Sequence, residues 1–168
     1  MEDNLIHRMD CWLRDNRPAY YATLQPPADD IDLDQFENRF SIKLPTEFRS
    51  LYKWRNGQDL LANNFDVLVG NQSLMPLENI ADTKEMLDGM IGFDFEDPKW
   101  WRRGWIPFLA NGGGDHLCLD IAAEDGGQPG QLISFWHDWD QRSVEFPNIT
   151  GWLTKLVESM ESGLIELD

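Results

Sequence analysis

The stretch that decides the fold runs from Trp105 to Ile121 and reads Trp105-Ile-Pro-Phe-Leu-Ala-Asn-Gly-Gly-Gly-Asp-His-Leu-Cys-Leu-Asp-Ile121. Residues 105–109 and 117–121 are two apolar runs of strand-forming residues, and the glycine-rich residues 111–115 separate them. Glycine, asparagine and aspartate tolerate positive φ angles, so this order predicts a β-hairpin with a bulge or a longer loop. Pro107 has no amide hydrogen for a ladder bond, so it belongs on an edge strand or at a bulge.

Three amphipathic helices are predicted before this hairpin. Residues 4–14 form the first. The second begins at Asp30 or Asp32, either of which can cap it, and the third opens at Pro45 and stops at Gly57, which suits a left-handed cap. Their apolar stripes consist of Leu5, Met9, Trp12 and Leu13, then Leu33, Phe36 and Phe40, then Phe48, Leu51 and Tyr52.

Shorter elements surround the hairpin. We expect a loop over residues 18–30, extended pieces at 60–61, 67–69, 74–77 and 91–97, a weak helix over 78–87, a strand over 131–136 and a last helix from Asn148 to Gly163. Helices followed by strands and a closing helix indicate an α+β fold. The 168 residues fit one domain, residues 1–168, in which residues 1–30 form an N-terminal helix and loop extension.

The composition limits the functional classes. Hydrophobic residues make up 42% of the chain and include 8 Trp and 9 Phe, which is too many for a disordered protein. No window approaches about 18 apolar residues, and the acidic residues 1–4 lack the apolar region of a signal peptide. We therefore expect a cytoplasmic protein in which Cys11 and Cys118 stay reduced and are buried as small hydrophobes.

Charge is the most unusual global feature of the sequence. Asp and Glu number 30 against 14 Lys and Arg, which gives a net charge of −16. A surface this negative repels nucleic acid and anionic membranes, and it attracts basic partners by long-range steering. The alternative is that the charge serves only solubility.

Three kinds of functional site are possible at these residues, and each has a structural alternative. Asp115, His116 and His137 are ligand-type residues for a metal-dependent hydrolase, but strand alternation places Asp115 and His116 on opposite faces. Cys118 could be a nucleophile, yet no orienting group for it can be named, so burial is favoured. The glycines at 112–114 lead into a strand and an aspartate, which favours a turn over a phosphate loop. The sequence predicts no catalytic residue, no metal ligand and no cofactor.

A further cluster is acidic and aromatic. Aromatic side chains supply buried anchor area at interfaces, and carboxylates supply electrostatic steering. The alternative is that the two adjacent tryptophans cover the core beside Trp105. The residues predicted to bind a partner are Asp94, Glu96, Asp97, Trp100, Trp101, Asp138 and Asp140.

Four pieces in a fixed order carry a resemblance to a known family. They are Leu44-Pro45 before the helix that ends at Asn56-Gly57, residues 105–108 leading through the glycines to Gly114-Asp115, residues 117–120, and residues 131–138. From Leu33 to Met160 the chain resembles the SUKH superfamily, in its branch named for the fungal Smi and Knr cell-wall regulators. The resemblance implies helices packed on a mixed, mainly antiparallel sheet. The matched positions are mainly structural, with Asp120 expected to accept from a turn amide: Leu44, Pro45, Gly57, Pro107, Gly114, Asp115 and Asp120.

The resemblance also implies a role without catalysis. Bacterial members often act as immunity proteins that neutralise toxins, frequently nucleases, whereas fungal members look like regulators of wall synthesis and scaffolds. We therefore predict a non-enzymatic immunity protein that binds a basic, nuclease-type toxin domain. The alternative is a regulatory scaffold or adaptor in cell-wall or envelope synthesis. In both cases the partner is a protein and not a nucleic acid or a membrane.

Overall fold

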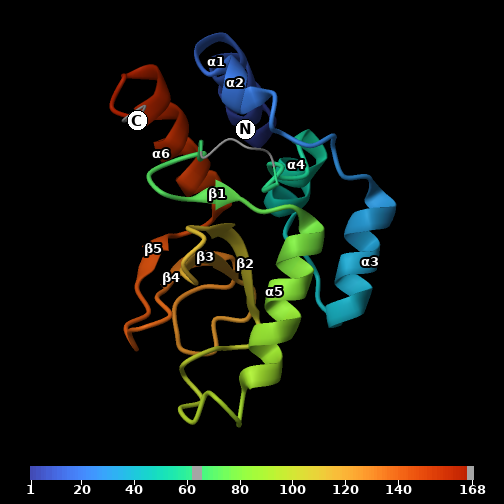
Figure 1. Ribbon diagram of the computed structural model, residues 1–168, viewed down its shortest axis with the longest axis vertical. Coiled ribbons are helices and arrows are strands. Elements are labelled where there is room, and N and C mark those ends of the chain that lie inside the picture. The colour runs from blue at the N-terminus through green and yellow to red at the C-terminus, as the bar shows by residue number, and fades with distance from the viewer. Residues whose placement is uncertain (62–65, 166–168) are drawn as a thin grey trace.

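The computed structural model describes residues 1–61 and 66–165 (Figure 1). Its helices are α1 (Glu2–Asn16), α2 (Pro18–Tyr21), α3 (Asp30–Phe40), α4 (Thr46–Trp54), α5 (Leu77–Met90) and α6 (Ile149–Glu161). Its strands are β1 (Ser73–Leu74), β2 (Trp105–Ala110), β3 (His116–Asp120), β4 (Gln131–Phe135) and β5 (Val144–Phe146). The predicted α+β class is confirmed. None of the described helices is long and apolar enough to cross a membrane.

The strands form one sheet in the order β1-β2-β3-β4-β5. β2 and β3 are the predicted hairpin, with Ile106 opposite Leu119 and Ala110 opposite His116. The register shifts between Pro107 and Leu109, so Pro107 lies at a bulge of an inner strand, one of the two places predicted for it. Every strand pair is antiparallel, in agreement with the mainly antiparallel sheet that the resemblance implied.

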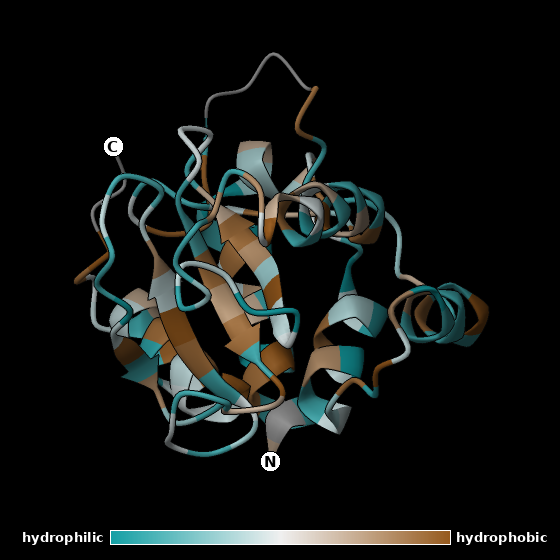
Figure 2. Cartoon of the chain, turned by 90° about the horizontal axis from the view of Figure 1, so that it is seen from below, coloured by the Kyte–Doolittle hydropathy of each residue, from teal (hydrophilic) through white to brown (hydrophobic). Residues whose placement is uncertain are grey.

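Both faces of the middle strands are buried. Leu117 and Leu119 face the main core, which the helices cover, whereas Cys118 faces a second, smaller core. That second core consists of Leu87, Trp101, Trp105, Cys118, Ile133 and Phe135. In Figure 2 the middle of the sheet is accordingly coloured hydrophobic, and the loops around it are hydrophilic. The end of α5 and the chain after it therefore act as the second layer over the sheet.

The helix boundaries follow the predicted signals closely. α3 begins at Asp30, one of the two predicted starts, but the cap is neither Asp30 nor Asp32: Asp29 caps the helix, in a capping box with Asp32. Pro45 directly precedes α4. Gly57 has the predicted left-handed conformation, with φ of +73°, but it lies two residues beyond the C-cap Arg55. A Cβ at Gly57 would come within 2.4 Å of the Pro76 nitrogen, so close backbone packing also requires a glycine there.

Several short predictions were wrong. Residues 67–69 form no strand, because Val69 makes only an isolated bridge with Gln72. Residues 60–61 lie in a turn. Residues 91–97 are not extended either, since the Gly92 and Phe95 backbones pair across a tight turn. Helix α2 and strand β5 were not predicted, because each is too short to show a hydrophobic period.

Candidate functional site

Two loops that are distant in sequence meet at one end of the molecule. The first, residues 91–100, follows α5, and the second, residues 136–142, connects β4 to β5. We call the following residues of these loops, which are exposed except for the half-buried Trp100, the acidic–aromatic surface: Phe93, Asp94, Glu96, Asp97, Trp100, Asp138, Trp139 and Asp140. The fold therefore brings together five of the predicted carboxylates and Trp100.

Arg142 holds the two loops against each other. Its guanidinium donates from Nε and Nη2 to the Trp100 carbonyl, at 3.2 and 2.9 Å. Nη1 donates to the carbonyls of Gln141, at 2.9 Å, and of Trp139. The guanidinium also lies 5.1 Å from the ring of Trp100 and 4.6 Å from that of Phe135. A half-buried cation that bonds carbonyls of both loops fixes their relative position, since each bond to a charged donor is stronger than a neutral one.

Most carboxylates of this surface form no ion pair with the described residues. Asp94, Glu96 and Asp140 form no ion pair with any described residue, and Asp97 accepts a hydrogen bond only from the Lys99 backbone amide. Asp138 approaches a single partner, Nε2 of His137, at 3.1 Å. Burial lowers the pKa of Arg142, and the nearby carboxylates of Asp140 and Asp97 oppose that shift.

The aromatic side chains divide between the surface and the core. Trp101 is 1% exposed, and its indole donates to Asp88 at 2.8 Å, so it offers no area to a partner and is left out of the surface. Trp100 is half-buried beneath Arg142. Sequence reasoning missed Phe93 and Trp139, which are 82% and 66% exposed. The available signal was their position in polar, turn-rich stretches, where no neighbouring strand or helix covers a side chain.

A buried ion pair anchors the first loop to α5. Lys84 is 1% exposed, and its ammonium lies 3.1 Å from Asp88 and donates to the Arg103 carbonyl. Asp88 also accepts the indole bond of Trp101. Burial lowers the pKa of Lys84, while Asp88 opposes that shift. Lys84 and Asp88 therefore hold Trp101 and Arg103, which directly follow the first loop, against α5.

The tip of the hairpin anchors the second loop. Asp115 accepts hydrogen bonds from the backbone amide of His137 at 3.0 Å and from its Nδ1 at 2.8 Å. The hydrogen bond to Asp115 raises the pKa of His137, and the charge of Asp138 adds to this. Gly114, with φ of +102°, lies against the His137 ring, where a Cβ would come within 3.2 Å of Cγ. A glycine at this position therefore lets the loop close onto the hairpin.

The residues weighed for catalysis do not converge. His116 is buried and faces the Leu109 carbonyl at 3.2 Å, away from the Asp115–His137 pair. Burial lowers the pKa of His116 and raises that of Cys118, so both are neutral groups of the interior. Among the described residues, no group of three or more His, Cys, Asp or Glu side chains is placed to hold a metal ion.

The positions matched by the resemblance contact the interior or turns. Asp120 accepts from the turn amides of Ala122 and Ala123, as predicted, and from the side chain of Gln131 at 3.0 Å. Leu44 lies in the main core, and its amide donates to Glu37 at 2.9 Å. These contacts agree with a structural role for these positions.

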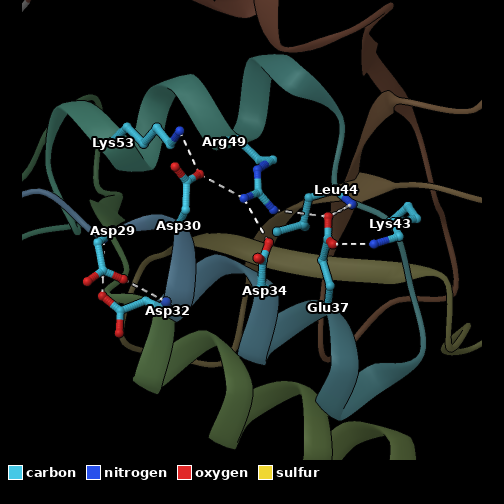
Figure 3. Close-up of polar contacts among 9 residues, drawn as sticks. All are labelled: Asp29, Asp30, Asp32, Asp34, Glu37, Lys43, Leu44, Arg49 and Lys53. Atoms are coloured by element: carbon cyan, nitrogen blue, oxygen red, sulfur yellow. Dashed lines mark hydrogen bonds and ion pairs between the residues drawn. The ribbon is translucent and has the colours of Figure 1, made fainter.

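A second acidic group lies on α3, where the carboxylates are paired (Figure 3). Arg49 of α4 reaches Asp30 and Asp34, each at 2.9 Å, and Glu37 at 3.3 Å. Burial would raise the pKa of Glu37, but Lys43, the Leu44 amide and Arg49 together lower it. We call Asp30, Asp34, Glu37, Lys43, Arg49 and Lys53 the α3–α4 network. Its carboxylates serve to pack two helices.

Comparison with known proteins identifies the family. The model of the SMI1/KNR4 family (SUKH-1) matches residues 27–155. KNR4/SMI1 homolog 2 of Debaryomyces hansenii is 25% identical over 99% of this chain and 36% of its own length. Cell wall assembly regulator SMI1 of Saccharomyces cerevisiae is 20% identical over 92% of this chain and 39% of its own length.

A third relative has the same extent. Cell wall biosynthesis/cell cycle regulator smi1 of Schizosaccharomyces pombe is 25% identical over 93% of this chain and 35% of its own length. The chain thus spans between 35% and 39% of the length of these three relatives. The match with the family model covers most of the chain and includes the hairpin, the α3–α4 network and both loops. The chain therefore belongs to the SMI1/KNR4 family (SUKH-1).

Proposed function

We propose that this chain is a non-enzymatic protein-binding domain that acts as a regulatory adaptor in cell-wall or envelope synthesis. The observation that carries the proposal is the acidic–aromatic surface, where Phe93 and Trp139 are exposed and where Asp94, Glu96 and Asp140 form no ion pair with the described residues. Exposed aromatic area of this kind is typical of binding sites and is costly to leave in water. Phe93 and Trp139 of this surface are largely exposed, whereas the charged side chains of the α3–α4 network join two helices.

The family relatives favour regulation over immunity. Two of the three are named for the regulation of cell-wall assembly or biosynthesis, and none of the three names mentions a toxin. Immunity against a toxin was the main prediction from the sequence, and it stays a prediction here. The two roles share the need for a protein partner, but they differ in when the protein is needed.

A catalytic role finds less support in the described residues. The Cys118 thiol and the His116 imidazole are buried in the sheet, and Asp115 is occupied by His137 and Asn111. A general acid or base must reach its substrate, so these groups are poorly placed for one. Binding to a partner requires exposed side chains, and the two loops provide them.

The experiment is deletion of the gene in its own organism, grown without any competing cell or toxin. The proposal expects a defect in the wall or envelope, seen as sensitivity to wall-stressing compounds, and rescue by the wild-type gene. A silent deletion, together with protection against a co-expressed neighbouring toxin, would instead support immunity and overturn the regulatory role. Unchanged growth under both conditions would also count against the proposal.

A further inference from the structure

We infer that the acidic–aromatic surface binds a basic segment of a partner protein, with arginine or lysine side chains placed around an apolar residue. This inference rests on the proposed function and adds the chemistry of the partner. Three features of the surface support it: exposed apolar area, charge complementarity and the rigidity of the two loops.

The apolar part extends from the loops onto the sheet. Phe93 and Trp139 are accompanied by Trp136 and Val144, which are 42% and 56% exposed. Val144 lies opposite Ile133, on the face of the sheet that carries the second core. The cover over this face therefore leaves Val144 of β5 exposed, and this apolar area suits an apolar side chain of a partner.

The charges of the two loops select a cationic partner. Asp94, Glu96 and Asp97 lie on the first loop, and Asp138 and Asp140 lie on the second. When an arginine or lysine of a partner approaches these carboxylates, attraction to its positive charge offsets the repulsion among the neighbouring negative charges. The ring of Trp139 also offers a face for a cation. Nucleic acids and anionic membranes present phosphates, which these carboxylates repel. A basic protein segment is the class that fits.

The free edge of the sheet does not provide the binding mode. β5 is an edge strand of three residues, its pairing with β4 has a register shift, and Pro147 follows it directly. Short, irregular edges that end in proline resist the addition of another strand. Recognition is therefore expected to proceed through side chains of the two loops and not through backbone pairing.

The two loops are held in place before any partner arrives. Arg142 bonds the Trp100 and Trp139 carbonyls, and His137 is fixed to Asp115 of the hairpin. Bonds of this kind reduce the conformational entropy that ordering the surface would cost on binding. The surface thus has the three properties of a binding site: apolar area, an unbalanced charge and a fixed shape.

The test uses a short synthetic peptide in which arginines and leucines alternate in a glycine–serine background, labelled for fluorescence anisotropy. Wild-type protein should bind it, more weakly as salt is added, because exposed charge pairs are screened. The triple variant Asp94→Asn/Glu96→Gln/Asp140→Asn should bind about tenfold more weakly. Trp139→Ala should lose a similar factor of about ten.

A matched control removes the same number of charges elsewhere. Asp3, Glu78 and Glu158 are exposed and form no ion pair with the described residues, so Asp3→Asn/Glu78→Gln/Glu158→Gln reports on net charge alone. It should retain affinity within about twofold, since distant exposed charges are largely screened. An equal loss in both triple variants, or no binding by the wild-type protein, would overturn the inference. Far-UV circular dichroism confirms that each variant is folded.

The two proposals fail separately. If the loop triple variant binds no peptide yet rescues the deletion strain fully, the basic-segment inference is wrong and the regulatory role stands. If the peptide binds as expected and the deletion is silent, the regulatory role is wrong and the surface stands. Backbone amide shifts on peptide addition should map to residues 93–100 and 136–144, and shifts confined to α3 would contradict the inference.

Discussion

The α3–α4 network and the acidic–aromatic surface both contain several carboxylates, but these are paired with cations in the network and mostly unpaired on the surface. On α3, Arg49, Lys53 and Lys43 meet the acidic side chains, and Glu37 is buried among them. On the two loops, Arg142 donates its hydrogen bonds to backbone carbonyls, and Asp94, Glu96 and Asp140 form no ion pair with the described residues. Acidic residues that a fold uses for itself are paired, and those left unpaired beside exposed aromatic rings are available to a partner.

The largest difference between the regions should appear on removal of Glu37. The change Glu37→Ala leaves the buried Leu44 amide without an acceptor and Arg49 with fewer partners. We expect a loss of about 2–4 kcal/mol in the free energy of unfolding. Urea denaturation measures it, with Glu96→Ala as the control from the loops, expected within about 0.5 kcal/mol. Equal losses of stability in Glu37→Ala and Glu96→Ala would contradict the difference between the α3–α4 network and the acidic–aromatic surface.

Acidification should destabilise the α3–α4 network by protonating Glu37. The folded-state pKa of Glu37 lies below its ordinary value of 4.5, so its contribution is present above that pH and disappears as the pH falls through the lowered value. The variant Glu37→Gln should therefore lose less stability than the wild type on acidification from neutral pH. Urea midpoints at a series of pH values test this. If Glu96→Gln flattened the profile as much as Glu37→Gln, the assignment to Glu37 would be wrong.

Arg142 should matter more for the loops than for the domain. The change Arg142→Met removes the bonds to the Trp100, Trp139 and Gln141 carbonyls, at an expected cost of about 1–2 kcal/mol. Hydrogen exchange at the amides of Trp100 and Trp139, which bond within their own loops, should accelerate. Exposed Arg103 provides the control, because Arg103→Met leaves both loops intact. If the two amides remain protected from hydrogen exchange in Arg142→Met, contacts other than those of Arg142 hold the loops in place.

A smaller effect concerns His137, which joins the hairpin to the second loop. Its folded-state pKa is raised above 6.5, so its contribution is complete below that pH and disappears as the pH rises through the raised value. An NMR titration of the imidazole should give a pKa above 6.5. Asp115→Asn should lower it more than Asp138→Asn, because the hydrogen bond to Asp115 is the main cause of the shift. The reverse order would contradict the geometry.

The smallest effect on stability should come from the loop carboxylates. The triple variant Asp94→Asn/Glu96→Gln/Asp140→Asn should unfold within about 0.5 kcal/mol of the wild type, since none of the three forms an ion pair with the described residues. Relief of mutual repulsion would appear as a slight gain. A loss comparable to that of Glu37→Ala would show that these carboxylates serve the fold and would weaken their assignment to a partner.

Local signals in the sequence determined much of the architecture. The hairpin followed from two apolar runs around glycines, and the bulge at Pro107 followed from its missing amide hydrogen. The start of α3, the buried stripe of α4 and the turn role of Asp120 came from capping, periodicity and side-chain chemistry. These features depend on neighbours within a few residues, which is why a single sequence reveals them.

Long-range contacts decided the rest. The sequence shows acidic residues at 30–37, 94–97 and 138–140 alike. Only the fold pairs Asp30, Asp34 and Glu37 with Arg49 and leaves Asp94, Glu96 and Asp140 without an ion pair among the described residues. Whether Trp101 or Trp139 is exposed depends on which one the second core of the sheet reaches, and Asp88 lies close enough to accept from Trp101. Pairing and burial are set by distances through space, and spacing along the chain does not contain them.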